Sequence, residues 1–174
     1  MVNNKWNKKY TKESHNCYSY FLNKTSKKAK RHCKKVLKKG KKRCPRPQPG
    51  YAAGFPKIKK SDYTCKKMIK RTLADNPSIK KTTKKRCPNG YYKGALVVAP
   101  KKDYHYYRKH KHKKWGHKMS WTKATMRDVK GKLLKNIKKA NRNYKHFGNF
   151  NKFCSYFCVP KKTKKYMKLL PKVK

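Results

Sequence analysis

Thiol and imidazole side chains are the groups in this sequence most able to do covalent chemistry. Cys17 lies in the segment HNCYSY, His105 in DYHYYRK and His117 in WGHKMSW. A thiolate can attack a carbonyl carbon when an imidazole within hydrogen-bond reach takes its proton and a third polar group orients that imidazole. Cys17, His105 and His117 are therefore candidates for nucleophile, base and orienting residue.

Spacing by itself is weak support for this set, because seven cysteines and seven histidines make some Cys and His pairing inevitable. His105 could instead be a strand residue packed among tyrosines, and His117 a turn residue. His110 and His112, in KHKHKK, are interpreted as basic surface. Catalysis and simple packing are both open on these grounds.

An odd number of cysteines leaves at least one thiol free or paired with another chain. Zinc is the rival to disulfides, but no CxxC occurs and only Cys154 and Cys158 lie close together. We predict no metal and no cofactor, and we leave the redox state open. Possible disulfides involve Cys33, Cys44, Cys65, Cys87, Cys154 and Cys158.

One long helix over residues 17–39 is predicted to position Cys17, because apolar or small side chains recur there at three- and four-residue steps. Asn16 is a good N-cap, and Gly40 followed by Pro45 is a good stop. Cys17 would then lie in the first helical turn, where the positive end of the helix dipole stabilises a thiolate.

The next segments predict a loop and a second helix. Residues 43–56 carry four prolines and two glycines, which is typical of a loop. A helix is predicted over 61–76, ended by Pro77, and residues 78–86 form a basic linker.

Three short strands are predicted to carry the histidines. Aromatic and β-branched or aliphatic residues separated by tight links indicate an antiparallel meander. Residues 128–132 could be a turn or part of a helix, and residues 153–160 are compact and aromatic. The predicted strands are 91–99, 103–109 and 115–121.

The predicted fold class is therefore α+β: a helix carrying Cys17 packed on a small antiparallel meander. Length supports one domain. We expect this domain over 16–160, a basic N-terminal arm over 1–15 and a basic C-terminal tail over 161–174.

Charge dominates the composition, with 55 Lys and Arg residues against five acids and a formal net charge of +50. Lysine predominates over arginine, which favours diffuse neutralisation of phosphate or carboxylate over reading of bases. We therefore expect an acidic protein or nucleic-acid partner. The predicted polyanion-binding residues are Lys27, Lys28, Lys34, Lys35, Lys38, Lys39, Lys41, Lys42, Lys161, Lys162, Lys164 and Lys165.

Other broad classes are disfavoured by composition. The 13 tyrosines and the apolar periodicity argue against a disordered chain. The longest unbroken apolar stretch is 95–99, so no membrane-spanning helix is predicted. Residues 1–10 contain no apolar run, so no signal peptide is predicted.

The order of these motifs resembles the NlpC-type branch of the papain-like fold. Its pattern is a cysteine at a helix start, a "GDLV"-like strand, here GALVVAP, a histidine opening the next strand, and a third polar residue on the strand after. The resemblance implies Cys17 as nucleophile, His105 as base and His117 as orienting residue. Ala95 departs from it, because the family motif carries an acid there.

More narrowly, the chain resembles a group of small uncharacterised proteins from bacteria and large DNA viruses. The resemblance rests on NCYSY, QPGY, CPNGYYKGALVVAPKKDYHYYRK, WGHKMS and FCSYFCVP. The density of lysine is similar to that of virion proteins of large DNA viruses.

The function expected first is a structural component of a virus particle, either a minor capsid or a core-associated protein, that bridges acidic capsid neighbours or the genome. Its location would be the inner side of the capsid or the core. One alternative is a papain-like thiol hydrolase that uses Cys17 and His105. Another is a nucleic-acid-binding protein without sequence preference, whose tyrosines stack on bases.

Overall fold

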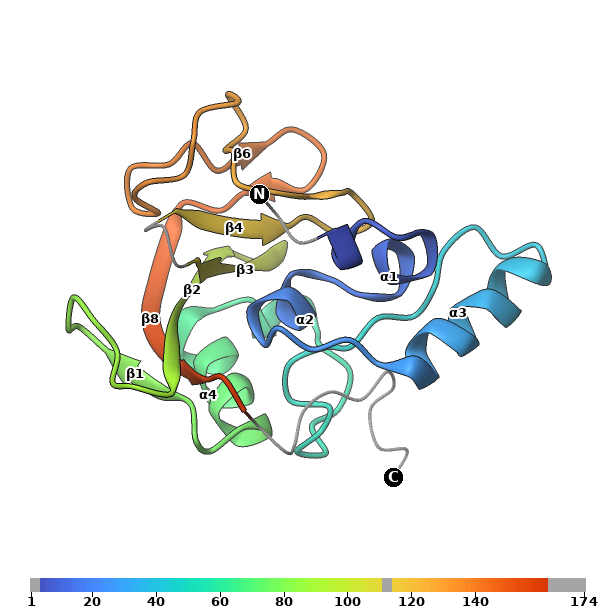
Figure 1. Cartoon of the computed structure of the whole chain (residues 1–174), viewed down its shortest axis with the longest axis horizontal. Coiled ribbons are helices and arrows are strands. Elements are labelled where there is room, and N and C mark those ends of the chain that lie inside the picture. The colour runs from blue at the N-terminus through green and yellow to red at the C-terminus, as the bar shows by residue number, and fades with distance from the viewer. Residues whose placement is uncertain (1–3, 111–113, 163–174) are drawn as a thin grey trace.

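The computed structural model describes residues 4–110 and 114–162. Within these ranges the chain forms an α+β domain with short helices around an antiparallel sheet (Figure 1). The helical elements are η1 (Asn4–Trp6), α1 (Lys9–Ser14), α2 (Cys17–Phe21), α3 (Lys27–Lys38), η2 (Lys60–Asp62) and α4 (Cys65–Asp75). The strands are β1 (Lys80–Thr82), β2 (Tyr91–Ala99), β3 (Asp103–Lys109), β4 (Trp115–Lys118), β5 (Ala124–Thr125), β6 (Asn143–Tyr144), β7 (Gly148–Asn149) and β8 (Lys152–Pro160).

The main sheet has the strand order β1-β8-β2-β3-β4-β5, and every pairing is antiparallel. The predicted meander is confirmed: β2 and β3 have the predicted bounds, and β4 is the first part of the predicted third strand. Five strands were not predicted, and three of them, β1, β5 and β8, belong to this sheet. β8, in the aromatic segment over 153–160, pairs with β2 along its length, and β1 lies outside it.

Two apolar layers cover the two faces of the sheet. On one face, α2 and α4 pack against side chains such as Leu96, Tyr106 and Phe157. On the other face, the irregular segment before β8 packs Leu134, Ile137 and Phe150 against the sheet (Figure 1).

The predicted helix over 17–39 is wrong as a single element, because the chain breaks after α2. Asn23 adopts a left-handed conformation with φ of 52°, which no continuing α-helix contains. The side chain of Ser26 then accepts a hydrogen bond from the backbone N–H of Ala29 and starts α3 as a new N-cap. The predicted ends at Asn16 and Gly40 are confirmed.

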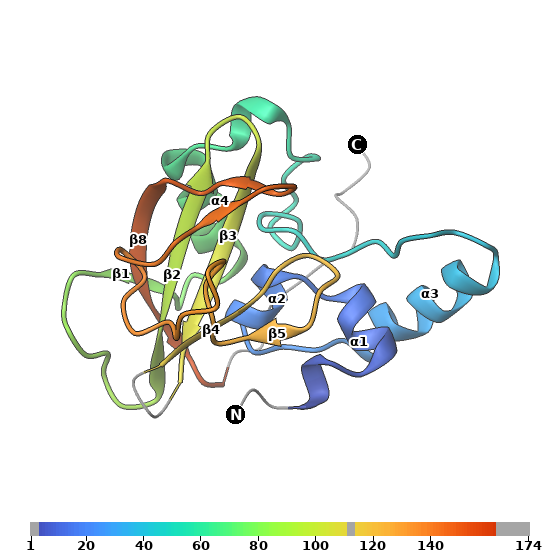
Figure 2. The same ribbon diagram turned by 90° about the horizontal axis from the view of Figure 1, so that it is seen from above.

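Because the chain breaks there, α2 can lie flat against the sheet while α3 projects from the body of the molecule (Figure 2). α2 approaches β2 closely: a side chain at Gly94 would collide with the ring of Phe21. In α3 only Ala29 and Cys33 are buried, and its remaining surface is mostly lysine.

Disulfides link the outer parts of the chain to one another and to the sheet. They join Cys33 to Cys44, Cys65 to Cys154 and Cys87 to Cys158. These are the six cysteines considered for disulfides, and Cys154 and Cys158, considered as a metal pair, are each bonded elsewhere. Cys17 is free and buried.

The predicted N-terminal arm is wrong, whereas the predicted loop and second helix are confirmed. Residues 4–14, expected as a basic arm, form η1 and α1, and Trp6 is fully buried. Residues 43–56 form the predicted loop, and α4 begins four residues later than predicted. Gly131 has φ of 75°, so 128–132 is a turn and not a helix.

Most of the predicted tail lies outside the described residues. Lys161 and Lys162 are exposed after β8, whereas Lys164 and Lys165 fall in the part that the structure does not describe. None of the helices in the described ranges is long and apolar enough to cross a bilayer.

Candidate active site

Cys17 and His105 line the same pocket, which has a volume of about 330 Å³. Three parts of the chain meet there: the start of α2, the loop between α3 and η2, and the first half of β3. The turn after β4 completes the wall with Met119 and Ser120. The structure therefore brings the predicted nucleophile and the predicted base to one site.

The start of α2 positions Cys17. Asn16 caps the helix, because its Oδ1 accepts a hydrogen bond from the backbone N–H of Ser19 at 3.2 Å. Its Nδ2 donates to the carbonyl oxygen of Pro47 at 2.7 Å, which ties the helix start to the loop wall. Cys17 is only 5% exposed.

The second half of β3 pairs with β4, and α2 packs against Tyr104 and Tyr106 of β3. The backbone N–H of Tyr106 donates a hydrogen bond to the Cys17 thiol, which lowers the pKa of that thiol. Because Tyr106 directly follows His105, this contact places the sulfur beside the strand that carries the predicted base.

His105 and His117 form a directed chain of hydrogen bonds. Nε2 of His117 lies 3.0 Å from the carbonyl oxygen of Arg127, and a carbonyl can only accept, so Nε2 carries the proton. In the neutral ring Nδ1 of His117 is then an acceptor, and Nε2 of His105, 2.8 Å away, donates to it. This leaves Nδ1 of His105 unprotonated.

Both imidazoles are kept neutral by their surroundings. His105 and His117 are each 1% exposed. Burial lowers the pKa of His117 to about 4, and burial together with the neighbouring His117 holds the pKa of His105 well below its usual range. The neutral tautomers assigned above are therefore the forms present near neutral pH.

The thiol is also neutral in this arrangement, contrary to the expectation of a stabilised thiolate. Burial raises the pKa of Cys17 to about 12, and the carboxylate of Asp103 adds to the rise. Arg46 and Lys118 act in the opposite direction but are weaker influences. The expectation fails because desolvation of a buried thiolate exceeds what the first turn of a five-residue helix offsets.

Asp103 is an ionisable group of the pocket that was not among the predicted site residues. Burial raises the pKa of its carboxyl to about 6, while the backbone N–H of Tyr104 and the guanidinium of Arg46 act to lower it. It precedes His105 by two positions, so strand alternation was a signal that could have placed it on the same face.

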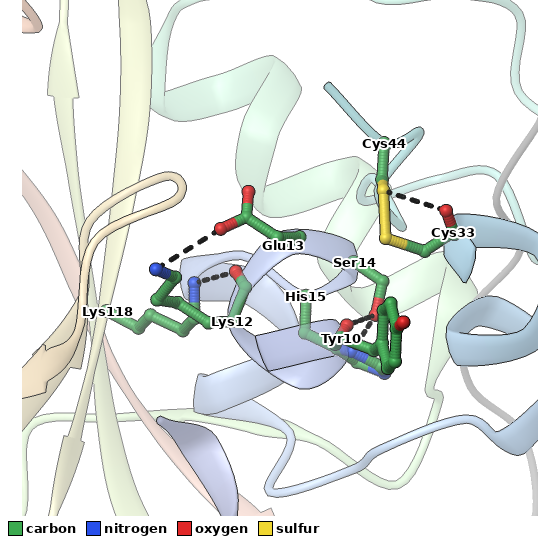
Figure 3. Close-up of a disulfide and its surroundings, with 8 residues drawn as sticks. All are labelled: Tyr10, Lys12, Glu13, Ser14, His15, Cys33, Cys44 and Lys118. Carbon is green, nitrogen blue, oxygen red and sulfur yellow. Dashed lines mark hydrogen bonds and ion pairs between the residues drawn. A yellow bond between two sulfur atoms is a disulfide. The ribbon is translucent and has the colours of Figure 1, made fainter. Parts of the chain in front are cut away.

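Lys118 is a second unpredicted group, fully buried behind the site. Its Nζ donates to the carbonyl oxygens of Lys12 and Ser120, each at 2.6 Å. Figure 3 shows it beside α1, where Lys12 also pairs with Glu13 at 3.3 Å. Burial lowers the pKa of Lys118 to about 7. A neutral amine has two N–H donors, which match the two carbonyl acceptors.

The loop between α3 and η2 supplies polar atoms that no sequence pattern indicated. Arg46 donates to Oγ of Ser120 at 2.7 Å, and its guanidinium lies 3.9 Å from the ring centre of Trp121. Gln48 accepts a hydrogen bond from the hydroxyl of Tyr104. The disulfide between Cys33 and Cys44 anchors the start of this loop to α3 (Figure 3).

No family model, curated protein or solved structure matches this chain.

Other predicted residues lie away from this pocket. The lysines of α3 are exposed on the projecting helix. His110, interpreted as basic surface, is instead partly buried, with its Nε2 2.8 Å from the hydroxyl of Tyr20. His112 lies outside the described residues.

Proposed function

We propose that this chain is a cysteine hydrolase or acyltransferase of the papain-like type, with Cys17 as nucleophile, His105 as general base and His117 as the residue that orients the base. One observation carries the proposal. The hydrogen bonds from His105 through His117 to the carbonyl of Arg127 leave Nδ1 of His105 as a proton acceptor, and His105 lines the same pocket as Cys17.

The reaction follows from the neutral resting state. The thiol of Cys17 gives its proton to Nδ1 of His105 as the sulfur attacks a carbonyl carbon, and a carbon–sulfur bond forms while the carbonyl π electrons move to oxygen. Collapse of this intermediate breaks the bond to the leaving group, which takes the proton from His105. Water or an amine, deprotonated by His105, then attacks the thioester carbon, the carbon–sulfur bond breaks, and His105 returns the proton to the sulfur of Cys17.

Two features support these roles. The imidazolium of His105 would keep its hydrogen bond to His117, so the base does not rotate while charged. The backbone N–H of Cys17 lies in the first turn of α2, where a helix leaves its amides without an internal acceptor, and it is suited to bind the developing oxyanion.

The test uses the fact that Cys17 is the single free thiol among the seven cysteines, all of which lie in the described ranges. Incubation with p-nitrophenyl acetate should release a burst of one p-nitrophenolate per chain and leave an acetyl thioester at Cys17. Thioesters are cleaved by hydroxylamine, whereas acetylated lysines are not, so mass spectrometry before and after hydroxylamine separates the two products.

Matched variants make this test decisive. Cys17→Ala should abolish the burst, and His105→Gln should slow it strongly. His32→Gln, which removes an exposed imidazole on α3, is the control and should leave it unchanged. Acetylation confined to lysines, or an equal burst from Cys17→Ala, would refute the enzyme proposal.

A second candidate is the basic structural component of a virus particle, and the charge of +50 carries it. The exposed lysines of α3 project from the body and meet no acidic residue on their own helix. Binding to duplex DNA should be tight at low salt and weaken steeply with salt, since each neutralised phosphate releases a counterion. Absence of binding to DNA at low salt, together with absence from any purified particle, would refute this candidate.

A further inference from the structure

The five carboxylates of the chain are all engaged away from one strongly basic pocket. Glu13 pairs with Lys12, and Asp62 pairs with Lys67 and Arg71. Asp75 accepts hydrogen bonds from backbone N–H groups and from the hydroxyl of Tyr18. Asp128 accepts from backbone N–H groups of its own turn and of Asn141, and Asp103 lines the candidate active site.

The basic pocket lies at the opposite end of β3 from Asp103 and has a volume of about 750 Å³. Its wall contains two tyrosines, Tyr91 and Tyr92, and no acidic residue. The hydroxyl of Tyr92 donates to the carbonyl oxygen of Phe21 at 2.8 Å, which fixes that ring. The cationic side chains in the wall are Lys85, Arg86, Lys93, Arg108, Lys109 and Lys161.

Arg108 is the decisive residue of this pocket, because it is only 7% exposed and has no carboxylate partner among the three ion pairs of the described residues. Its Nη1 donates to the carbonyl oxygen of Tyr20 at 3.0 Å, and its guanidinium lies 4.2 Å from the centre of the phenol ring of Tyr20. A buried cation with only neutral partners is costly unless an anion compensates it.

The form of the pocket indicates which anion would compensate. A guanidinium presents a planar fork of donors that fits phosphate oxygens. The volume greatly exceeds that of one phosphate ion, and tyrosine rings in the wall provide apolar faces on which a base can stack. We propose that this pocket binds the phosphate groups of a nucleotide, either free or within a single strand of nucleic acid.

This site is independent of the chemistry at Cys17. It deepens the second candidate function, because it assigns one part of the polyanion contact to a defined pocket with Arg108 at its base. The wall of the pocket contains no residue of α3, so binding of a mononucleotide can be tested separately at the two places.

The experiment compares two variants that lose the same charge from exposed residues. Lys85→Gln/Arg86→Gln alters the pocket rim, and Lys34→Gln/Lys35→Gln alters α3. Fluorescently labelled adenosine triphosphate is titrated at constant low salt. We expect the rim variant to weaken binding about tenfold or more, and the α3 variant to change it less than about twofold.

A third variant tests the planar donors of the Arg108 guanidinium. Arg108→Lys keeps the charge but removes the planar donors, and it should also weaken binding, while an unchanged thermal midpoint would show that the fold is intact. Competition distinguishes the two ligands: displacement of the label at a lower concentration of unlabelled adenosine triphosphate than of a short oligonucleotide indicates a free nucleotide, and the reverse order indicates a strand.

Equal losses from the rim and α3 variants, or no saturable binding of either probe, would overturn the proposal. Retention of duplex DNA under those conditions would leave the second candidate function standing, so the two failures are distinguishable.

Discussion

His105 and His117 meet through Nε2 of the first and Nδ1 of the second, 2.8 Å apart, with their ring planes at 90°. The two strands that carry them are paired neighbours, and His117 lies opposite Tyr107 in the register. The two histidines are thus held by a sheet and not by loops, so the direction of their hydrogen bond is built into the strand pairing.

Alkylation of Cys17 is predicted to accelerate with pH. With the pKa of this thiol raised to about 12 by burial, the thiolate fraction increases tenfold per pH unit through the neutral range. The rate with iodoacetamide should therefore rise roughly 100-fold from about pH 7 to about pH 9. A rate that is constant across this range would instead reveal a thiolate paired with a charged His105.

Asp103→Asn is predicted to make Cys17 more reactive. The carboxylate of Asp103 raises the pKa of the thiol, so its removal lowers that pKa and increases the thiolate fraction. Alkylation should be several-fold faster at pH values above the Asp103 pKa of about 6, and the difference should vanish below it. Asp62→Asn removes an equal charge that does not affect Cys17 and is the control. Equal rates for Asp103→Asn and the unsubstituted chain above this pKa would contradict the assigned electrostatics.

Substitution of His117 should reveal its orienting role. His117→Leu removes the acceptor for His105 and should slow acetylation of Cys17 by about 10- to 100-fold. His117→Asn supplies an amide oxygen that can accept the same hydrogen bond, as the asparagine of papain-like sites does, and should restore much of the rate. A purely structural role would make both variants lose stability and activity in parallel, which urea unfolding monitors.

Lys118 is predicted to make the protein more stable as pH rises above neutrality. Its pKa is lowered by burial from 10.5 to about 7 in the folded state, so between these values the unfolded chain binds more protons. The free energy of unfolding should then rise by at most about 1.4 kcal/mol per pH unit from this residue. Lys118→Met should flatten that rise between about pH 7 and about pH 9, and Lys123→Met, at an exposed position, should not. Parallel curves for both variants would show that Lys118 is charged when folded.

The two disulfides that attach to β8 should stabilise the fold non-additively. They close overlapping segments of the chain, with sequence separations of 89 and 71 residues. While one disulfide is present, forming the other closes only a short loop, which consists of residues 65–87 and 154–158 joined through the first disulfide. In the chain-entropy model, removing both with Cys→Ala pairs should therefore cost about 1 kcal/mol more than the sum of the single removals. Denaturant unfolding of the three variants measures this, and simple additivity would contradict the model.

Local patterns were sufficient to predict the elements that carry the site. The aromatic and β-branched or aliphatic composition, with tight links between the segments, placed β2 and β3 at their observed bounds, and the N-cap at Asn16 placed Cys17 at a helix start. The helix over 17–39 failed because Asn23 and Ser26 act through backbone geometry, which periodicity does not record. The pairing of β8 with β2 is a long-range contact that no local window contains.

The electrostatics of the site were less accessible from sequence than its members. Cys17 was placed correctly at a helix start, yet the sign of its pKa shift was wrong, because that shift is set by burial under the sheet and by Asp103. Arg46 and Gln48 come from a loop whose path depends on the disulfide to Cys44 and on the hydrogen bond from Asn16 to Pro47. Such contacts appear only when the chain is folded.

The carbonyl of Arg127, which ends the hydrogen-bond chain of the histidines, belongs to the main chain. Any amino acid that keeps the bridge between residues 127 and 133 supplies the same oxygen, so this position can drift freely in evolution while its atom stays indispensable. Alanine scanning of the segment would miss it. Changes to the backbone, such as a deletion in the turn at 128–132 or an ester in place of the amide, would alter the hydrogen bond from His117 to this oxygen. Through His117 they would alter Nδ1 of His105, the proposed proton acceptor.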